Sequence, residues 1–196
     1  MEKLEQILQF IREAEGLKSV LRTAWTAAGR QESTAEHSWR LALLATVLLD
    51  EFSTLDAQKV LVLCLVHDIG ELYCGDISAA KQPDKVQKYS DELAAVHKLC
   101  AMLPKKSGHM LFAVWEEYEN EKTPEALFVK ALDKAETIIQ HNQGKNPADF
   151  DYAFNFRYGE EYFEQNKILK ELRVLIDADT AAHIKEAAEP DYSLLK

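Results

Sequence analysis

The chain of 196 residues is long enough for one well-cored domain, and 47% hydrophobic with 29% charged residues is typical of a globular protein. The formal net charge of −10 argues against polymeric DNA or RNA as a partner, although a small phosphorylated ligand stays possible. No apolar run approaches the ~18–20 residues of a membrane span, and the three cysteines show no paired spacing, so we expect a cytoplasmic protein with reduced thiols.

Helical periodicity dominates the sequence and no convincing strand pattern is present, so we predict an all-α protein with about seven to eight helices. The first predicted helix ends near Gly16. Four apolar residues mark its predicted inner face: Leu4, Ile7, Leu8 and Ile11. The second predicted helix begins at Ser33, which has the spacing of a capping box with Glu36.

The third predicted helix stops around Gly70 and has four residues facing inward: Val60, Leu61, Cys64 and Leu65. A loop over 77–85 precedes further helices over about 86–102 and 108–121. The next helix starts with Thr123 as N-cap and Pro124 at the first helical position, and it runs to Gly144. A polar and aromatic linker and one more long helix, over 160–176, complete the predicted bundle.

Three of these helices carry His or Asp residues next to apolar positions. His37 is followed by leucines at helical spacing, His67 and Asp68 end the apolar run "VLVLCLV", and Asp133 lies within "LFVKALDKAETII". An isolated His-Asp pair is most simply a helix end with a solvated carboxylate. Unpaired polar groups on inward helix faces are costly, however. The combination therefore predicts that the four side chains meet in a shared interior.

Buried charges are stable when they are paired or when they bind a metal ion. Two imidazoles and two carboxylates form a mixed nitrogen and oxygen donor set that suits Mn, Fe, Co, Ni or Zn and leaves positions open for water and substrate. A buried network of structural His and Asp groups without a metal is the alternative. The pattern favours the catalytic metal site over that network.

The order His37, then His67 and Asp68, then Asp133 resembles the H…HD…D pattern of the HD-domain metal-dependent phosphohydrolases. The segments "RTAW", "AEHSWR", "HDIGELYCGD" and "LDKAE" resemble the branch that contains the 5′-deoxynucleotidases. The resemblance implies an all-helical HD-domain bundle in which these four residues bind one divalent metal ion. Mn, Co, Mg, Fe, Ni and Zn are all candidates for that ion.

Four further residues take functional roles by the same resemblance. Glu71 would orient or deprotonate a metal-activated water, and Asp76 would protonate the leaving 5′ oxygen, although the reverse assignment is equally open. Arg22 is the expected phosphate clamp, because a guanidinium can bind phosphate in bidentate fashion. Trp25 would line the sugar or base pocket. Without the resemblance, a surface ion pair for Arg22 and a core position for Trp25 are as plausible.

The implied function is metal-dependent hydrolysis of (deoxy)nucleoside 5′-monophosphates to nucleoside and phosphate. Two alternatives stay open. One is an HD hydrolase of another phosphate ester, such as a cyclic nucleotide or an alarmone, and the other is a non-catalytic nucleotide-binding sensor. The expected partner is a small nucleotide, with no polymeric nucleic acid and no membrane.

We expect a single HD domain over residues 1–196, with the metal-site core at about 20–140 and C-terminal helices over 157–196 packed on it. We also expect a homodimer, from the resemblance and from the aromatic content of the later helices. Both expectations concern the assembly of the fold rather than its chemistry.

Overall fold

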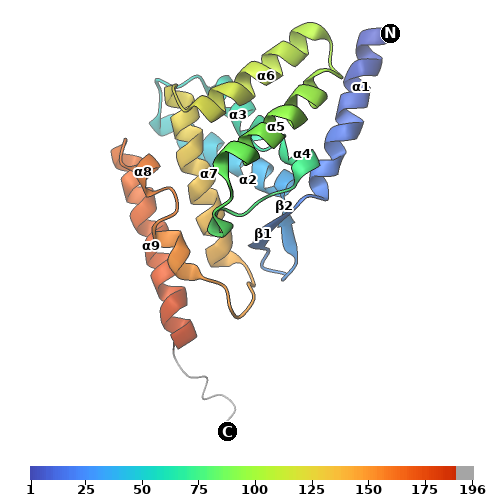
Figure 1. Ribbon diagram of the computed structural model, residues 1–196. Coiled ribbons are helices and arrows are strands. Elements are labelled where there is room, and N and C mark those ends of the chain that lie inside the picture. The colour runs from blue at the N-terminus through green and yellow to red at the C-terminus, as the bar shows by residue number, and fades with distance from the viewer. Residues whose placement is uncertain (189–196) are drawn as a thin grey trace.

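The structure is a computed structural model that describes residues 1–188. Within this range it is helical except for one short antiparallel β-hairpin, which confirms the predicted all-α class. Helix α7 (Pro124–Gln143) runs through the centre of the bundle (Figure 1). It packs against five other helices: α2 (Thr34–Leu48), α3 (Ala57–Val66), α6 (Lys105–Asn120), α8 (Glu160–Phe163) and α9 (Lys167–Ala188).

The hairpin consists of β1 (Leu21–Trp25) and β2 (Gln31–Ser33), which pair antiparallel. The sequence-based prediction of no strands is wrong at this point, because strands of five and three residues are too short to show alternation. Gly29 allows the turn between them, since its φ of 85° lies in a region that side chains other than glycine rarely adopt. The hairpin leads directly into α2, whose N-cap is Ser33, and the predicted capping box with Glu36 is confirmed.

Helix α1 (Glu2–Ala14) and the 3-10 turn η1 (Glu15–Lys18) precede the hairpin at the edge of the molecule (Figure 1). The predicted inner face of this first helix is wrong. Leu4, Ile7, Leu8 and Ile11 are 66%, 38%, 52% and 58% exposed, and Phe10 is the buried residue. Helix α1 is amphipathic, but only its residue Phe10 belongs to the buried apolar cluster that includes residues of α3, α5 (Lys85–Cys100) and α6.

Helix α3 buries Val60 and Cys64 as predicted, whereas the prediction for Leu65 is wrong because this side chain is 56% exposed. Leu63 and Val66 are buried in its place. Apolar residues occupy every position of the run, so periodicity alone could not separate the buried face from the exposed one.

Short elements connect the long helices: η2 (Leu49–Glu51), α4 (Glu71–Cys74), η3 (Ala79–Lys81), η4 (Tyr152–Phe156) and α8 (Glu160–Phe163). The single helix predicted over 160–176 is wrong, because the chain breaks after α8. The side chain of Asn166 accepts a hydrogen bond from the backbone N–H of Ile168 and starts α9 anew. The part of the predicted C-terminal packing that falls on 189–196 lies outside the described residues.

None of the helices within residues 1–188 is long and apolar enough to cross a membrane.

Leu63 belongs to the core cluster between α2, α3 and α7, so Leu63→Ala is expected to lower the free energy of unfolding by about 2–5 kcal/mol. Leu65→Ala, two residues away on the exposed side, is the matched control and should change it by no more than about 0.5 kcal/mol. Urea titration of the two variants measures both values. Equal losses would contradict the placement of α3.

Candidate metal centre and its cavity

The structure brings the four predicted metal ligands together from three helices. His37 comes from the first turns of α2, His67 and Asp68 from the end of α3, and Asp133 from the middle of α7. His37 Nε2 lies 3.1 Å from Asp133 Oδ1 and 3.8 Å from Asp68 Oδ2. His67 Nε2 lies 2.9 Å from Asp68 Oδ2 and 4.0 Å from Asp133 Oδ1. One ligand atom from each side chain therefore faces a common point.

The imidazole of His67 is oriented by its own helix. Its Nδ1 lies 2.9 Å from the carbonyl oxygen of Cys64 and donates to it, so the lone pair of Nε2 faces the common point. Nε2 is buried and, among the described residues, has no partner in hydrogen-bond geometry, although Asp68 lies nearby. A buried imidazole nitrogen left in this way is what a metal ligand requires.

A buried carboxylate fixes the second imidazole. Glu136 Oε2 forms a short contact with Nδ1 of His37, which leaves Nε2 of His37 for the common point. Both residues are fully buried, with exposed fractions of 0% and 1%. A carboxylate behind a ligating histidine holds the ring in place and raises its basicity.

Asp133 divides its two oxygens between support and binding. Oδ2 accepts hydrogen bonds from the Tyr118 hydroxyl and from the ammonium of Lys134, each at 2.8 Å. Oδ1 is the oxygen that faces the two imidazoles. The carboxylate is thus held rigidly with one oxygen directed at the common point.

The charges around this point favour a cation. Burial and Arg22 lower the pKa of His37, but Glu136 and Asp133 outweigh them and raise it to about 10. Burial opposes the ionisation of Asp68 and Asp133, yet the neighbouring imidazoles, with Lys134 in the case of Asp133, keep the pKa of each carboxyl below its ordinary value. Two ionised carboxylates and two directed imidazoles fit a divalent ion, which would replace the proton on His37.

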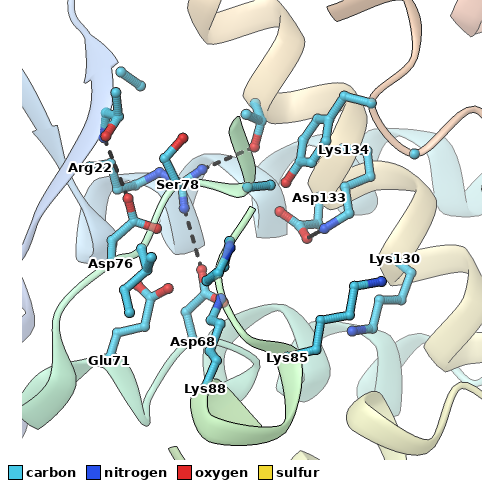
Figure 2. Close-up of a pocket in the computed structure, with 18 of the residues that line it drawn as sticks. Arg22, Asp68, Glu71, Asp76, Ser78, Lys85, Lys88, Lys130, Asp133 and Lys134 are labelled. Carbon is cyan, nitrogen blue, oxygen red and sulfur yellow. Dashed lines mark hydrogen bonds and ion pairs between the residues drawn. The ribbon is translucent and has the colours of Figure 1, made fainter. Parts of the chain in front are cut away.

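The common point opens into a cavity of about 540 Å³ (Figure 2). Glu71 and Asp76 line this cavity together with Asp68 and Asp133. Glu71 begins α4, is 2% exposed, and accepts a hydrogen bond from the Thr34 hydroxyl at 3.0 Å. Burial raises the pKa of Glu71 well above its ordinary value, and Asp68 and Asp76 raise it further. A carboxyl in this environment holds a proton more readily than an ordinary glutamate, as a proton-transfer group requires.

Asp76 follows Gly75, whose φ of 76° turns the chain at the end of α4. One of its carboxylate oxygens lies 3.4 Å from the backbone nitrogen of Thr23 on β1. The hairpin, which the sequence did not predict, therefore helps to hold the carboxylate of Asp76, one of the two candidate proton-transfer residues.

Arg22 on β1 also reaches the cavity, and it is buried rather than on the surface. Its guanidinium lies 3.4 Å from Asp68 and 3.4 Å from Glu32, and it donates to the Thr137 hydroxyl at 3.0 Å. The Asp68, Asp76 and Glu71 carboxylates keep its pKa above the ordinary value despite burial. The structure thus holds a permanent cation beside the candidate ligands (Figure 2).

The structure does not bring Trp25 to this cavity. Its ring packs edge-on against Phe150 at 6.2 Å between centroids, and its carbonyl oxygen accepts a hydrogen bond from Gln140. Thr23 and Ala24 of the same strand line the cavity instead. Burial alternates along β1, with Arg22 and Ala24 buried and Trp25 on the other face of the strand.

Sequence reasoning missed the residues that support the ligands. Glu136 lies three positions after Asp133, so both fall on one face of α7, and this spacing could have identified it. Thr34 gave no signal, because a threonine after an N-cap is ordinary. Tyr118 reaches Asp133 from another helix, which only the tertiary structure could show.

Removal of a divalent ion from this centre is expected to destabilise the protein, because the folded state then loses the binding free energy of the ion that links the buried ligands of α2, α3 and α7. At a free metal concentration one hundred times Kd, binding contributes about 2.7 kcal/mol. For a chain of this size, that corresponds to a fall in Tm of about 5–10 °C on chelation. Thermal unfolding of the metal-saturated protein, before and after addition of EDTA, measures this fall in Tm. The same Tm in both samples would contradict the site.

Comparisons with known proteins agree with this geometry. The HD domain family matches residues 14–173. The chain is 37% identical to the 5′-deoxynucleotidase HDDC2 of Homo sapiens over 139 residues, which are 70% of this chain and 67% of that protein. A 5′-deoxynucleotidase of Saccharomyces cerevisiae is 30% identical over 158 residues, 76% of this chain and 66% of the relative.

Among solved structures, the fold is similar to that of a predicted metal-dependent phosphohydrolase from Magnetospirillum magnetotacticum MS-1. The TM-score is 0.77 at 24% sequence identity, with 94% of this chain and 97% of that one covered. At this identity the likeness establishes the fold, which is the predicted HD-domain bundle.

Proposed function

Since the chain belongs to the HD domain family, we propose that it is a metal-dependent phosphomonoesterase that hydrolyses deoxynucleoside 5′-monophosphates to deoxynucleoside and phosphate. One observation carries the proposal. Glu71, Asp76 and Arg22 line the same cavity as Asp68 and Asp133, so acids for proton transfer, a phosphate-binding cation and metal ligands converge on one space. The relatives named as 5′-deoxynucleotidases support the substrate class.

We assign His37, His67, Asp68 and Asp133 as ligands of one divalent ion, with Mn, Co, Mg, Fe, Ni and Zn as candidates. Such an ion makes a water molecule more nucleophilic and neutralises charge on the phosphoryl oxygens. Glu136 and the Cys64 carbonyl set the tautomers of the two imidazoles. Tyr118 and Lys134 hold the Asp133 carboxylate.

Hydrolysis breaks the bond between phosphorus and O5′, places a hydroxyl on phosphorus, and moves one proton from water to the leaving oxygen. Glu71 and Asp76 are the two carboxyl groups that can pass this proton. Glu71 receives the Thr34 hydrogen bond on one oxygen only, which leaves its other oxygen for the attacking water. Asp76 would then donate to O5′. In the opposite assignment, Asp76 would take the proton from the water and Glu71 would donate to O5′.

Arg22 binds the phosphate in this proposal. Glu32 and Thr137 hold Nε and one terminal nitrogen, so the guanidinium keeps a fixed orientation with its other terminal nitrogen toward Asp68 and the cavity. A guanidinium that is already fixed in orientation loses little conformational entropy when it binds a phosphate. Trp25 has no part in this binding.

We further propose one domain, a homodimer and a cytoplasmic location. The contacts of α7 with both α2 and α9 support a single domain. Large exposed apolar side chains, such as Leu8 on α1 and Trp39 on α2, support self-association. The unpaired thiols of the cysteines support a reducing compartment.

Phosphate release from a panel of nucleotides tests the function. Metal-loaded protein should release inorganic phosphate from deoxynucleoside 5′-monophosphates, with a lower kcat/KM for the ribo forms and for 3′-monophosphates. A cyclic nucleotide hydrolase would instead convert a cyclic nucleotide to the monophosphate. The proposal would be contradicted if folded, metal-bound protein released no phosphate from any nucleotide of the panel.

A further inference from the structure

We propose that Lys85 and Lys130 form a second phosphate-binding subsite in the cavity, for a phosphate of the substrate other than the one that is hydrolysed. The substrate class is then a nucleotide with phosphates on both its 5′ and its 3′ oxygens. This inference rests on the proposed function, because the subsite would bind a second phosphate group of the same substrate.

The cavity is lined by charged residues of both signs. Seven Asp or Glu residues line it together with five of the chain's 23 Lys and Arg residues: Arg22, Lys85, Lys88, Lys130 and Lys134. Four of these five are each paired with a carboxylate that also lines the cavity, at 3.4 Å for Arg22, Lys88 and Lys130 and at 2.8 Å for Lys134. Lys85 is the exception.

The side chain of Lys85 has no hydrogen bond or ion pair within residues 1–188. Lys85 is the first residue of α5 and is exposed, and its side chain lines the cavity and reaches toward Lys130 (Figure 2). Its position at the N-terminal end of α5 adds the positive end of the helix dipole. A cation without a carboxylate partner is available to an anionic ligand such as a phosphate.

Lys130 is held so that its ammonium faces the cavity. Its side chain is 11% exposed, and Nζ lies 3.8 Å above the centre of the Tyr118 ring. Nζ donates a hydrogen bond to Glu119 at 3.4 Å and lies 3.5 Å from Glu121. These two carboxylates position the ammonium, and the third of its three N–H donors remains for a ligand.

The spacing between the two parts of the cavity fits two separate phosphates. Lys130 and Lys134 are four residues apart on α7, which is about 6 Å along the helix axis. Lys134 contacts the metal-ligand candidate Asp133, so the Lys85–Lys130 subsite lies about one helical turn from the reacting phosphate. Two directly bonded phosphates are closer than this, whereas phosphates on opposite sides of a sugar are separated by the ring. A cavity of about 540 Å³ has the size of a small-molecule pocket.

The test compares deoxyadenosine 3′,5′-bisphosphate with deoxyadenosine 5′-monophosphate. Calorimetry on the metal-loaded Glu71→Gln protein gives the two Kd values, and phosphate release by the unmodified enzyme gives the two kcat/KM values. We expect the bisphosphate to bind at least about tenfold more tightly, which is about 1.4 kcal/mol. In the Lys85→Met, Lys130→Met double variant this ratio should fall to about one.

Two single variants are matched controls. Lys81→Met removes an exposed lysine from η3, four residues before Lys85 and outside the cavity lining. Lys59→Met removes a lysine that is also held by two glutamates, but on α3 and away from the cavity. Both should keep the affinity ratio of the unmodified protein.

Equal affinities for the two nucleotides, or a ratio that the double variant leaves unchanged, would overturn the subsite. The subsite is supported if the bisphosphate binds more tightly than the monophosphate and this difference in affinity disappears in the double variant, even if neither nucleotide releases phosphate. In that last case the subsite stands and the proposed function fails.

Discussion

Asp68→Ala is expected to lower kcat/KM for phosphate release by about 10³ or more and to remove the bound metal. Asp68 Oδ2 lies near both imidazoles and near Arg22, so the substitution removes one candidate ligand and also one of the two carboxylates paired with the guanidinium. The metal contributes several kcal/mol of transition-state stabilisation, and each 1.36 kcal/mol corresponds to about tenfold in rate. Elemental analysis of the purified variant and an assay of phosphate release measure the two effects.

Asp50→Ala is the control, because Asp50 is an exposed carboxylate at the opposite end of α2 from His37. This variant should keep both metal and activity. An Asp68→Ala protein that is folded, carries a full equivalent of metal and works at the normal rate would rule out Asp68 as a ligand.

Glu71→Gln is expected to lower kcat by about 10²–10⁴ while metal content stays at that of the unmodified protein. The amide keeps the shape of the side chain and can still accept the hydrogen bond from Thr34, but it cannot carry a proton between water and O5′. Glu71 faces the cavity and is not one of the four ligands. Turnover and metal content therefore separate in this variant, whereas they fall together in Asp68→Ala.

Glu116→Gln, an exposed position on α6, provides the comparison for Glu71→Gln and should behave as the unmodified protein. Normal kcat in Glu71→Gln would remove this residue from the proton-transfer step. Loss of metal together with activity would show that Glu71 supports the metal centre.

The convergence of the four candidate ligands could be predicted because these residues follow a short ordered pattern on strongly helical segments. His67 and Asp68 are adjacent at a helix end, and His37 and Asp133 lie beside apolar positions of α2 and α7, so secondary structure alone directs them inward. The capping box at Ser33 and the Thr123–Pro124 start of α7 are local signals of the same kind, and both are confirmed.

The features that could not be predicted depend on contacts between distant segments. The hairpin that carries Arg22 is too short for periodicity to reveal, and Trp25 lies on the other face of β1, where it packs against Phe150 from a distant segment. The exposed face of α1 arises because the rest of the bundle covers only Phe10. Tyr118, which supports Asp133 from α6, had no sequence signal for the same reason.

Titration of metal-stripped protein with a divalent ion is the most direct test of the central claim. Phosphate release from a deoxynucleoside 5′-monophosphate is followed as the ion is added, with Mn, Co, Mg, Fe, Ni and Zn tried in turn. If one ion is bound by His37, His67, Asp68 and Asp133, activity should rise from the background and level off at about one equivalent of a tightly bound metal. Full activity in the stripped protein, or metal binding at one equivalent without any phosphate release, would contradict the account.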